Sequence, residues 1–259
     1  MSNKKWAIIL GGSSGLGLAT AKKLGLHQYN IIIVHRDRRS DLLSIENEFD
    51  AMRTNGVILK NYNFDATNVE KRDEILSDIN SWIGIDKINI LVHSIAKGNL
   101  KPMFSETEKT LDQKDFQLTL DAMAISVYDW TSSLVKQDLF SDDARIIAFT
   151  SEGNTKAIPN YAAVSAAKVA LEAIIRNIAL EFASIGIKAN CIQAGVVDTA
   201  SLRMIPENDK IKENAIQRNP NKRLTKPEDV ANVVYLLSTE EAKWITGTII
   251  KVDGGESLR

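Results

Sequence analysis

The stretch WAIILGGSSGLGLATAKKLGL, residues 6–26, decides the fold of this chain. It begins with an apolar run typical of a buried strand, passes through a loop with four glycines and ends in a helical pattern. Glycines at such a turn allow the backbone to approach a pyrophosphate closely, and the phosphates then lie at the positive N-terminus of the helix. A glycine cluster alone is weak evidence, but the strand before it and the helix after it supply the context of a dinucleotide site.

The rest of the chain repeats this alternation of short apolar runs and longer helical patterns. Several runs are apolar almost throughout, as parallel strands covered on both faces are. The order predicts an α/β fold with a doubly wound parallel sheet of the Rossmann type, in one domain over residues 1–259. The predicted strands are 6–10, 30–35, 57–61, 88–93, 144–150, 188–193 and 248–252, and the predicted helices are 15–28, 40–54, 69–84, 112–138, 161–185 and 227–238.

Residues 199–226 are the least regular segment of the sequence. The segment is too polar for a core and too long for a tight turn, and it directly follows a predicted strand. Long connections at strand ends often cover binding sites, so we expect a mobile substrate flap here, within the single domain.

Composition excludes several classes of function. The formal net charge of −1 offers no general attraction to nucleic acid. A single cysteine, Cys191, rules out an intramolecular disulfide and fits a reducing cytoplasm. The first apolar run is too short for a signal peptide or a membrane span, and no His/Cys/Asp cluster has the spacing of metal ligands. We therefore expect a cytoplasmic protein without a metal site, a membrane partner or a nucleic-acid partner.

The end of the second predicted strand indicates which cofactor binds. Residues 30–40 read NIIIVHRDRRS, where a carboxylate at the strand tip would bind the adenosine ribose of NAD. His35 and Arg36 stand at this tip instead, and cations here suit the 2′-phosphate of NADPH. NADPH is therefore favoured over NADH, with Asp37 facing the ribose as the alternative.

Tyr161 and Lys168 form a proton donor and a cation on one predicted helix. Seven positions at about 100° each bring the two side chains into near register, about 10 Å apart along the axis. An ammonium near a phenol favours the ionised phenol, so we expect a lowered pKa for Tyr161. An amphipathic helix that happens to carry both residues is the alternative.

These features together resemble the short-chain dehydrogenase/reductase superfamily over nearly the whole chain. The glycine loop, Asp65 in NFDAT, the helical Tyr and Lys and the ending TGTIIKVDGG carry the resemblance. Most members place three residues between the Tyr and the Lys. The six residues found here, with LVHSIA at 91–96 and AIPNY at 157–161, resemble the enoyl-acyl-carrier-protein reductases, in particular their smaller NADPH-using type.

The resemblance implies a role for each matching residue. Asp65 capping the next helix and Thr199 capping the flap are the alternatives. The implied contacts are the pyrophosphate for Gly11, Ser14, Gly15 and Leu16, the adenine for Asp65 and Ala66, the ribose side for Ser94, Ile95 and Ala96, the nicotinamide ribose for Lys168, and the nicotinamide carboxamide for Val197 and Thr199, with Ser13 and Gly195 as further cofactor-binding residues.

The activity implied is NADPH-dependent reduction of the carbon–carbon double bond of trans-2-enoyl-acyl-carrier-protein thioesters in fatty-acid synthesis. Tyr161 is the implied proton donor and Lys168 the implied ribose ligand, with Ser151 as a third catalytic candidate. Ser151 stands where many enoyl reductases have a second tyrosine, and it either binds the substrate carbonyl or only ends a strand. Asp121 stands roughly where ketone-reducing relatives carry an Asn that relays protons.

Two other functions remain as alternatives: a reductase of 3-oxoacyl or other ketones, and more distantly a non-catalytic NADP(H)-binding sensor. The implied partners are an enoyl thioester on acyl carrier protein or CoA and three further copies of the chain in a homotetramer. We expect four flap side chains to close over the acyl chain, and a basic patch to face the acidic carrier unless it is simply a solvated surface. The closing side chains are Leu202, Met204, Ile205 and Ile211, and the patch is Lys210, Lys212, Arg218, Lys222, Arg223 and Lys226, with Lys97 and Lys101 nearby.

Overall fold

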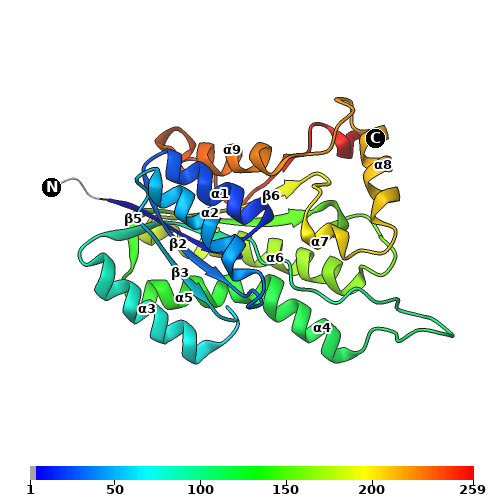
Figure 1. Ribbon diagram of the computed structural model, residues 1–259, viewed down its shortest axis with the longest axis horizontal. Coiled ribbons are helices and arrows are strands. Elements are labelled where there is room, and N and C mark those ends of the chain that lie inside the picture. Colours follow the sequence, from blue (N-terminus) through cyan, green and yellow to red (C-terminus); the bar gives the residue numbers. More distant parts are fainter. Residues whose placement is uncertain (1–3) are drawn as a thin grey trace.

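Seven parallel strands form one sheet in the order β3-β2-β1-β4-β5-β6-β7, in a computed structural model that describes residues 4–259 (Figure 1). The order reverses direction between β1 and β4, and this reversal opens a crevice at the carboxyl ends of the strands. The predicted fold class and all seven predicted strands are therefore confirmed. The strands are β1 (Lys5–Leu10), β2 (Tyr29–His35), β3 (Leu59–Asn63), β4 (Lys87–His93), β5 (Phe140–Ser151), β6 (Ile187–Ala194) and β7 (Ile249–Val252).

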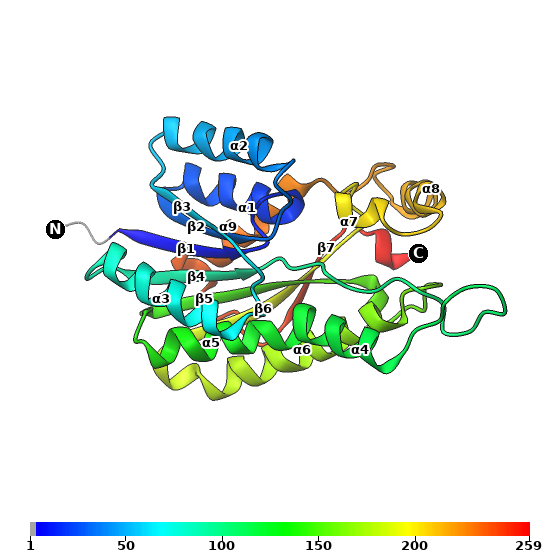
Figure 2. The same cartoon turned by 60° about the horizontal axis from the view of Figure 1, so that its bottom comes forward.

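Helices cover both faces of the sheet, as Figure 2 shows. On β1, Ala7 and Ile9 belong to one core, whereas Trp6, Ile8 and Leu10 belong to the other. Because successive side chains point to opposite faces, a strand between two helical layers must be apolar throughout. One layer contains α1 (Gly15–Leu26), α2 (Leu42–Thr54) and α9 (Pro227–Leu237), and the other contains α3 (Val69–Ile83), α4 (Gln113–Leu120), α5 (Ser126–Lys136) and α6 (Ala162–Glu181).

The helix predicted at 112–138 is interrupted. A π-helical turn at Asp121–Ile125 separates α4 from α5. A π turn inserts one residue and so rotates the side chains that follow, which makes it common at functional sites. Ala122 and Met123 consequently line the central cavity, whereas Asp121 is exposed and does not.

Several predicted boundaries are wrong by a few residues. The strand predicted at 144–150 begins earlier, at Phe140. The strand predicted at 57–61 begins only at Leu59, because Val57 packs against Gly25 of α1 instead of joining the ladder. The helix predicted at 161–185 ends at Glu181 and continues as a 3₁₀ turn, Ala183–Ile185, before Gly186 takes the left-handed conformation with φ of 84°.

Segment 199–226 is more regular than predicted. It contains α7 (Ala200–Arg203) and α8 (Asn208–Arg218), which lie at the carboxyl edge of the sheet with the C-terminus (Figures 1 and 2). The sequence of α8, NDKIKENAIQR, is mostly polar, so it lacks the apolar period that identifies a core helix. The mobility of the flap stays a prediction.

No helix within residues 4–259 combines the length and the apolar character that crossing a bilayer demands.

Candidate active site

A cavity of about 820 Å³ lies at the carboxyl edge of the sheet. It spans the crevice at the strand-order reversal and extends under the flap. Parallel strands bring residues that are distant in sequence to one edge, so the predicted site residues converge. The cavity is lined by all of them: Gly11, Ser13, Ser14, Gly15, Leu16, His35, Arg36, Asp65, Ala66, Ser94, Ile95, Ala96, Ser151, Tyr161, Lys168, Gly195, Val197 and Thr199.

The glycine loop presents a free helix N-terminus to this cavity. Gly11 has a φ of 82°, and its amide donates to the carbonyl oxygen of Val34 at 2.7 Å, which ties the loop to β2. Ser14 is the N-cap of α1, and within residues 4–259 its side chain makes no capping hydrogen bond. The first amides of α1 are therefore left to bind an anion, as a pyrophosphate site requires.

Gly17 controls how closely α1 approaches the loop. A Cβ at this position would lie 2.1 Å from the carbonyl oxygen of Gly11, a contact with backbone that no rotamer relieves. We expect Gly17→Ala to lower the free energy of unfolding by about 2–3 kcal/mol and to abolish NADPH binding. Urea unfolding and NADPH fluorescence measure both effects.

The matched control is Lys22→Ala on the exposed side of α1. Among residues 4–259, Lys22 pairs only with Glu48 on the surface, and such pairs contribute less than about 1 kcal/mol. If Gly17→Ala left the free energy of unfolding and the NADPH affinity unchanged, α1 would be able to move away from the loop, and the close approach at Gly17 would not be needed.

A cluster of charges lines the part of the cavity where the sequence predicts the adenosine. Arg36 Nη1 and Lys97 Nζ each donate to Oδ2 of Asp65 at 2.9 Å, and Thr67 donates to Oδ1 from its amide and its hydroxyl. Burial raises the pKa of Asp65, but the hydrogen bonds from Lys97 and Thr67 outweigh it and hold that pKa well below its usual range. The N-cap of α3 is Asn68, whose side chain accepts a hydrogen bond from the amide of Lys71. Asp65 therefore does not cap this helix.

The strand tip exposes one cation to the cavity. Asp37 Oδ2 lies 2.8 Å from His35 Nδ1, and the Asp37 amide donates to Asn63 Oδ1 at 3.0 Å. Asp37 is therefore tied to its neighbours and does not line the cavity, whereas Arg36 does.

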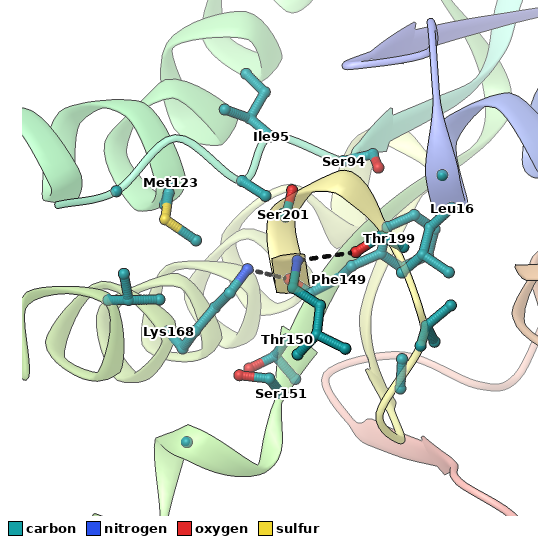
Figure 3. A pocket seen from close by; sticks show the side chains of 18 of the residues that line it. Leu16, Ser94, Ile95, Met123, Phe149, Thr150, Ser151, Lys168, Thr199 and Ser201 are labelled. Carbon is teal, nitrogen blue, oxygen red and sulfur yellow. Dashed lines mark hydrogen bonds between the residues drawn. The ribbon is translucent and has the colours of Figure 1, made fainter. Parts of the chain in front are cut away.

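The end of β5 and the start of α6 hold the catalytic candidates. Lys168 Nζ donates to the carbonyl oxygen of Phe149 at 2.7 Å (Figure 3), and Ser151 Oγ lies 3.5 Å from the Tyr161 hydroxyl. Tyr161 is the N-cap of α6 and so precedes the helix on which it was predicted. Its ring packs on Gly153, where a Cβ would lie 2.6 Å from Cε1 of the ring.

The protonation of this pair differs from the prediction. Burial raises the pKa of Tyr161, with Ser151 opposing the shift, so the expected lowering by Lys168 is wrong. Burial also lowers the pKa of Lys168 to about 8, although Cys191 and Glu172 oppose this shift. The physical reason is desolvation, which disfavours whichever form of a buried group is charged. Tyr161 is consequently a neutral phenol at pH 7, able to donate a hydrogen bond.

The inner part of the cavity is apolar. Val164 stands four positions before Lys168, where most relatives of the predicted superfamily place their tyrosine, and its side chain has no proton to donate. Met204 was predicted to close over the acyl chain, but its side chain is 75% exposed and does not line the cavity. The apolar lining comes from Leu100, Met123, Ile158, Val164, Leu202, Ile205 and Ile211.

An ion-pair network links the flap to the rest of the site, and no motif in the sequence predicted it. Arg218 of α8 donates to Glu152 Oε2 at 2.9 Å and to Glu256 Oε1 at 2.8 Å, and Glu256 Oε2 accepts from the amide of Val196. The three side chains come from separate segments, so no spacing in the sequence connects them. Glu172 was also missed, although its position one helical turn after Lys168 was a usable signal.

Most cations of the predicted basic patch are paired within the chain. Besides Arg218, the pairs are Lys210 with Glu207, Lys212 with Asp209, Arg223 with Asp229, Lys97 with Asp65 and Lys101 with Asp115. An acidic carrier would therefore have to compete with these carboxylates for the same cations.

Thr199 lies at the start of the flap, after β6. Thr199 Oγ1 accepts a hydrogen bond from the amide of Leu202 at 3.2 Å, so Thr199 both caps α7 and lines the cavity.

Across residues 4–259, no group of three or more His, Cys, Asp or Glu side chains is placed to hold a metal ion.

Comparisons with known proteins agree with the fold. Residues 11–257 match the family model described as enoyl-(acyl carrier protein) reductase. The chain is 27% identical to dehydrogenase/reductase SDR family member 4 of Oryctolagus cuniculus over 260 residues, which cover 98% of this chain and 94% of the relative. It is 26% identical over 254 residues to the 3-oxoacyl-(acyl-carrier-protein) reductase of Staphylococcus epidermidis, with 97% and 98% covered. The solved enoyl-(acyl-carrier-protein) reductase (NADH) of Aquifex aeolicus shares the fold, with a TM-score of 0.84, 22% identity and coverage of 98% and 97%.

Proposed function

This chain belongs to the short-chain dehydrogenase/reductase superfamily of oxidoreductases, and we propose that it reduces the carbon–carbon double bond of trans-2-enoyl thioesters with NADPH. One observation carries the proposal. Tyr161, seven positions before Lys168, lines the same cavity as Lys168, whereas the position four before Lys168 holds the buried Val164. The phenol of Tyr161 lies beside Ser151 and lines the same cavity as the apolar side chains.

The residues of the cavity fit a nicotinamide dinucleotide. The uncapped N-terminus of α1 suits the pyrophosphate, and the rim at Asp65 suits the adenine. Arg36 is more than half exposed at the strand tip, where a guanidinium binds a 2′-phosphate well. This cation, together with the withdrawal of Asp37 toward His35, supports NADPH over NADH.

Tyr161 and Lys168 would share the work of catalysis. A bound reduced nicotinamide supplies a hydride to the β-carbon of the substrate. The electron pair of the double bond then moves onto the thioester oxygen, where Tyr161 donates a hydrogen bond to the developing enolate. Uptake of one proton at the α-carbon completes the saturated product. Lys168 would hold the nicotinamide ribose hydroxyls and add positive potential near the oxygen.

The apolar lining supports an acyl chain as the substrate. Leu202, Ile205 and Ile211 of the flap line the same cavity as Met123 and Val164. Burying an apolar chain against such side chains yields about 0.8 kcal/mol for each methylene. The flap would therefore bind longer acyl chains more tightly than short ones.

Ketone reduction is the second candidate function. It is favoured by the full-length similarity to a 3-oxoacyl-(acyl-carrier-protein) reductase. The same phenol would then protonate an alkoxide rather than stabilise an enolate. Asp121 offers no proton relay for this reaction, because its exposed side chain does not line the cavity.

A direct comparison of substrates tests the proposal. We expect purified protein to oxidise NADPH with crotonyl-CoA at least tenfold faster than with acetoacetyl-CoA, and faster with NADPH than with NADH. Absorbance at the nicotinamide band measures each rate. Turnover of the ketone alone would replace the proposal with the second candidate, and NADPH binding without turnover of either would favour the sensor.

The assembly and the partners follow as parts of the same proposal. The substrate would be carried on acyl carrier protein or CoA for cytoplasmic fatty-acid synthesis, and the chain would assemble as a homotetramer. Large apolar side chains exposed on the layer of α4, α5 and α6 support an interface between subunits. They are Leu118, Ile125, Tyr128, Val169 and Leu180.

A further inference from the structure

We propose that Glu172 is a positioning residue of this active site, which fixes the end of β5 against α6 and supplies the negative charge that balances the ammonium of Lys168. The inference deepens the proposed function, because it rests on Lys168 as the ribose ligand. Glu172 lies one turn after Lys168 on α6, so the two side chains emerge on the same face of the helix.

Three consecutive residues at the end of β5 each contact one side chain of the α6 segment. The Phe149 carbonyl oxygen accepts from Lys168, the Thr150 hydroxyl donates to Glu172 Oε1 at 2.5 Å, and Ser151 lies beside Tyr161. Glu172 is therefore the central one of three contacts that set the distance between β5 and α6. A shift of this strand end would move the partners of both catalytic candidates.

A second donor to the same carboxylate comes from the 3₁₀ turn that follows β5, Glu152–Asn154. Asn154 Nδ2 donates to Glu172 Oε1 at 2.6 Å. Glu172 is only 7% exposed and Thr150 only 3%, so water does not compete well for these bonds. An oxygen that accepts two short hydrogen bonds from neutral donors is typical of a carboxylate.

The groups that face Lys168 from the other elements are neutral at pH 7. Burial raises the pKa of the Cys191 thiol on β6 to about 12, and burial with the charge of Lys168 lowers the pKa of His93 on β4 to about 3. Tyr161 is a neutral phenol, and Arg176 lies farther along α6 near Cys191. Among these described neighbours, Glu172 is thus the negative charge that stabilises the buried ammonium.

Glu172→Gln separates the charge from the shape. The amide oxygen of glutamine still accepts from Thr150 and Asn154, so the strand end stays in place while the charge is lost. We expect the pH at which NADPH affinity declines, near 8 in the parent, to fall by about one unit. At pH 8 the variant would bind NADPH about fivefold more weakly and at pH 9.5 about tenfold more weakly, whereas at pH 6.5 the two affinities would agree within about 1.5-fold. NADPH fluorescence between pH 6.5 and 9.5 measures this without any enoyl substrate.

Two further variants make the outcome decisive. Glu181→Gln removes a carboxylate from the exposed end of the same helix and should leave the pH profile unchanged. Thr150→Val keeps the charge but loses one hydrogen bond, and it should weaken NADPH binding by a similar factor at every pH. If the NADPH affinity of Glu172→Gln declined at the same pH as that of the parent, Glu172 would not supply the balancing charge. Thermal melts confirm that each variant is folded. Failure of the parent to bind NADPH at all would instead contradict the proposed function.

Discussion

Tyr161→Phe is expected to lower kcat for an enoyl thioester by about 10²–10⁴-fold and to leave the Kd for NADPH within about twofold. The substitution removes one hydroxyl and leaves the ring that packs on Gly153. Because burial keeps this phenol neutral at pH 7, its contribution is a prearranged hydrogen bond to the enolate oxygen. The ground state of the substrate needs that bond much less, so the loss should fall on kcat rather than on binding.

Steady-state kinetics with crotonyl-CoA and NADPH fluorescence measure the two quantities separately. Ser151→Ala is the matched control, because Ser151 lies 3.5 Å from the same hydroxyl. If Ser151 only orients the phenol, its loss should lower kcat about tenfold and no more. Weakened NADPH binding in Tyr161→Phe would show that the hydroxyl supports the cavity rather than the reaction.

Lys168→Met is expected to abolish turnover and, at the same time, to stabilise the fold. The ammonium is buried, and burial lowers its pKa to about 8 from an ordinary value near 10.5. Below pH 8 the native chain must therefore keep a poorly solvated charge, which an unfolded chain would leave in water. A methionine of similar length removes this penalty, while Glu172 keeps its hydrogen bonds from Thr150 and Asn154, so we expect the free energy of unfolding at pH 7 to rise by roughly 1–3 kcal/mol.

The pH dependence gives this prediction its sign. Between pH 8 and pH 10.5 the unfolded chain holds the proton on Lys168 and the native chain does not, so this lysine makes stability rise with pH. The advantage of Lys168→Met should accordingly be largest below pH 8 and should shrink as the pH rises to 10.5. Urea unfolding of both proteins at several pH values measures the difference. A variant that is less stable at pH 7 would mean that the bond to Phe149 outweighs the buried charge.

The helices and strands were predictable where a single period runs through them. The strand at 30–35 is buried on both faces and the helix at 15–28 packs one face against the core, so burial imposes apolar patterns that the sequence displays. The prediction failed where a local pattern is absent or is overridden. The polar helix α8 has no apolar period. The sequence around the π turn at Asp121–Ile125 has the pattern of one continuous α-helix, so the interruption was not predicted.

The candidate site shows the same division. Its location was predictable, because the glycine loop and the strand ends must meet at one edge of a parallel sheet. Met204 was misplaced, since a residue in a short helix can face either the cavity or the solvent. Arg218, Glu152 and Glu256 were out of reach, because their ion pairs join segments that are remote along the chain.

The sequence by itself determined the parallel sheet, the cofactor loop and the edge at which the site forms. Residues 6–26 predict the loop, and the alternation of apolar runs and helical patterns along the rest of the chain predicts the sheet. Those features depend on local periodicity and on the backbone freedom of glycine, which neighbours along the chain reveal. Only the tertiary structure decided the protonation of Tyr161 and Lys168 and the contacts of Glu172. Desolvation and the distances between remote side chains govern those properties, and both come into existence only when the chain is folded.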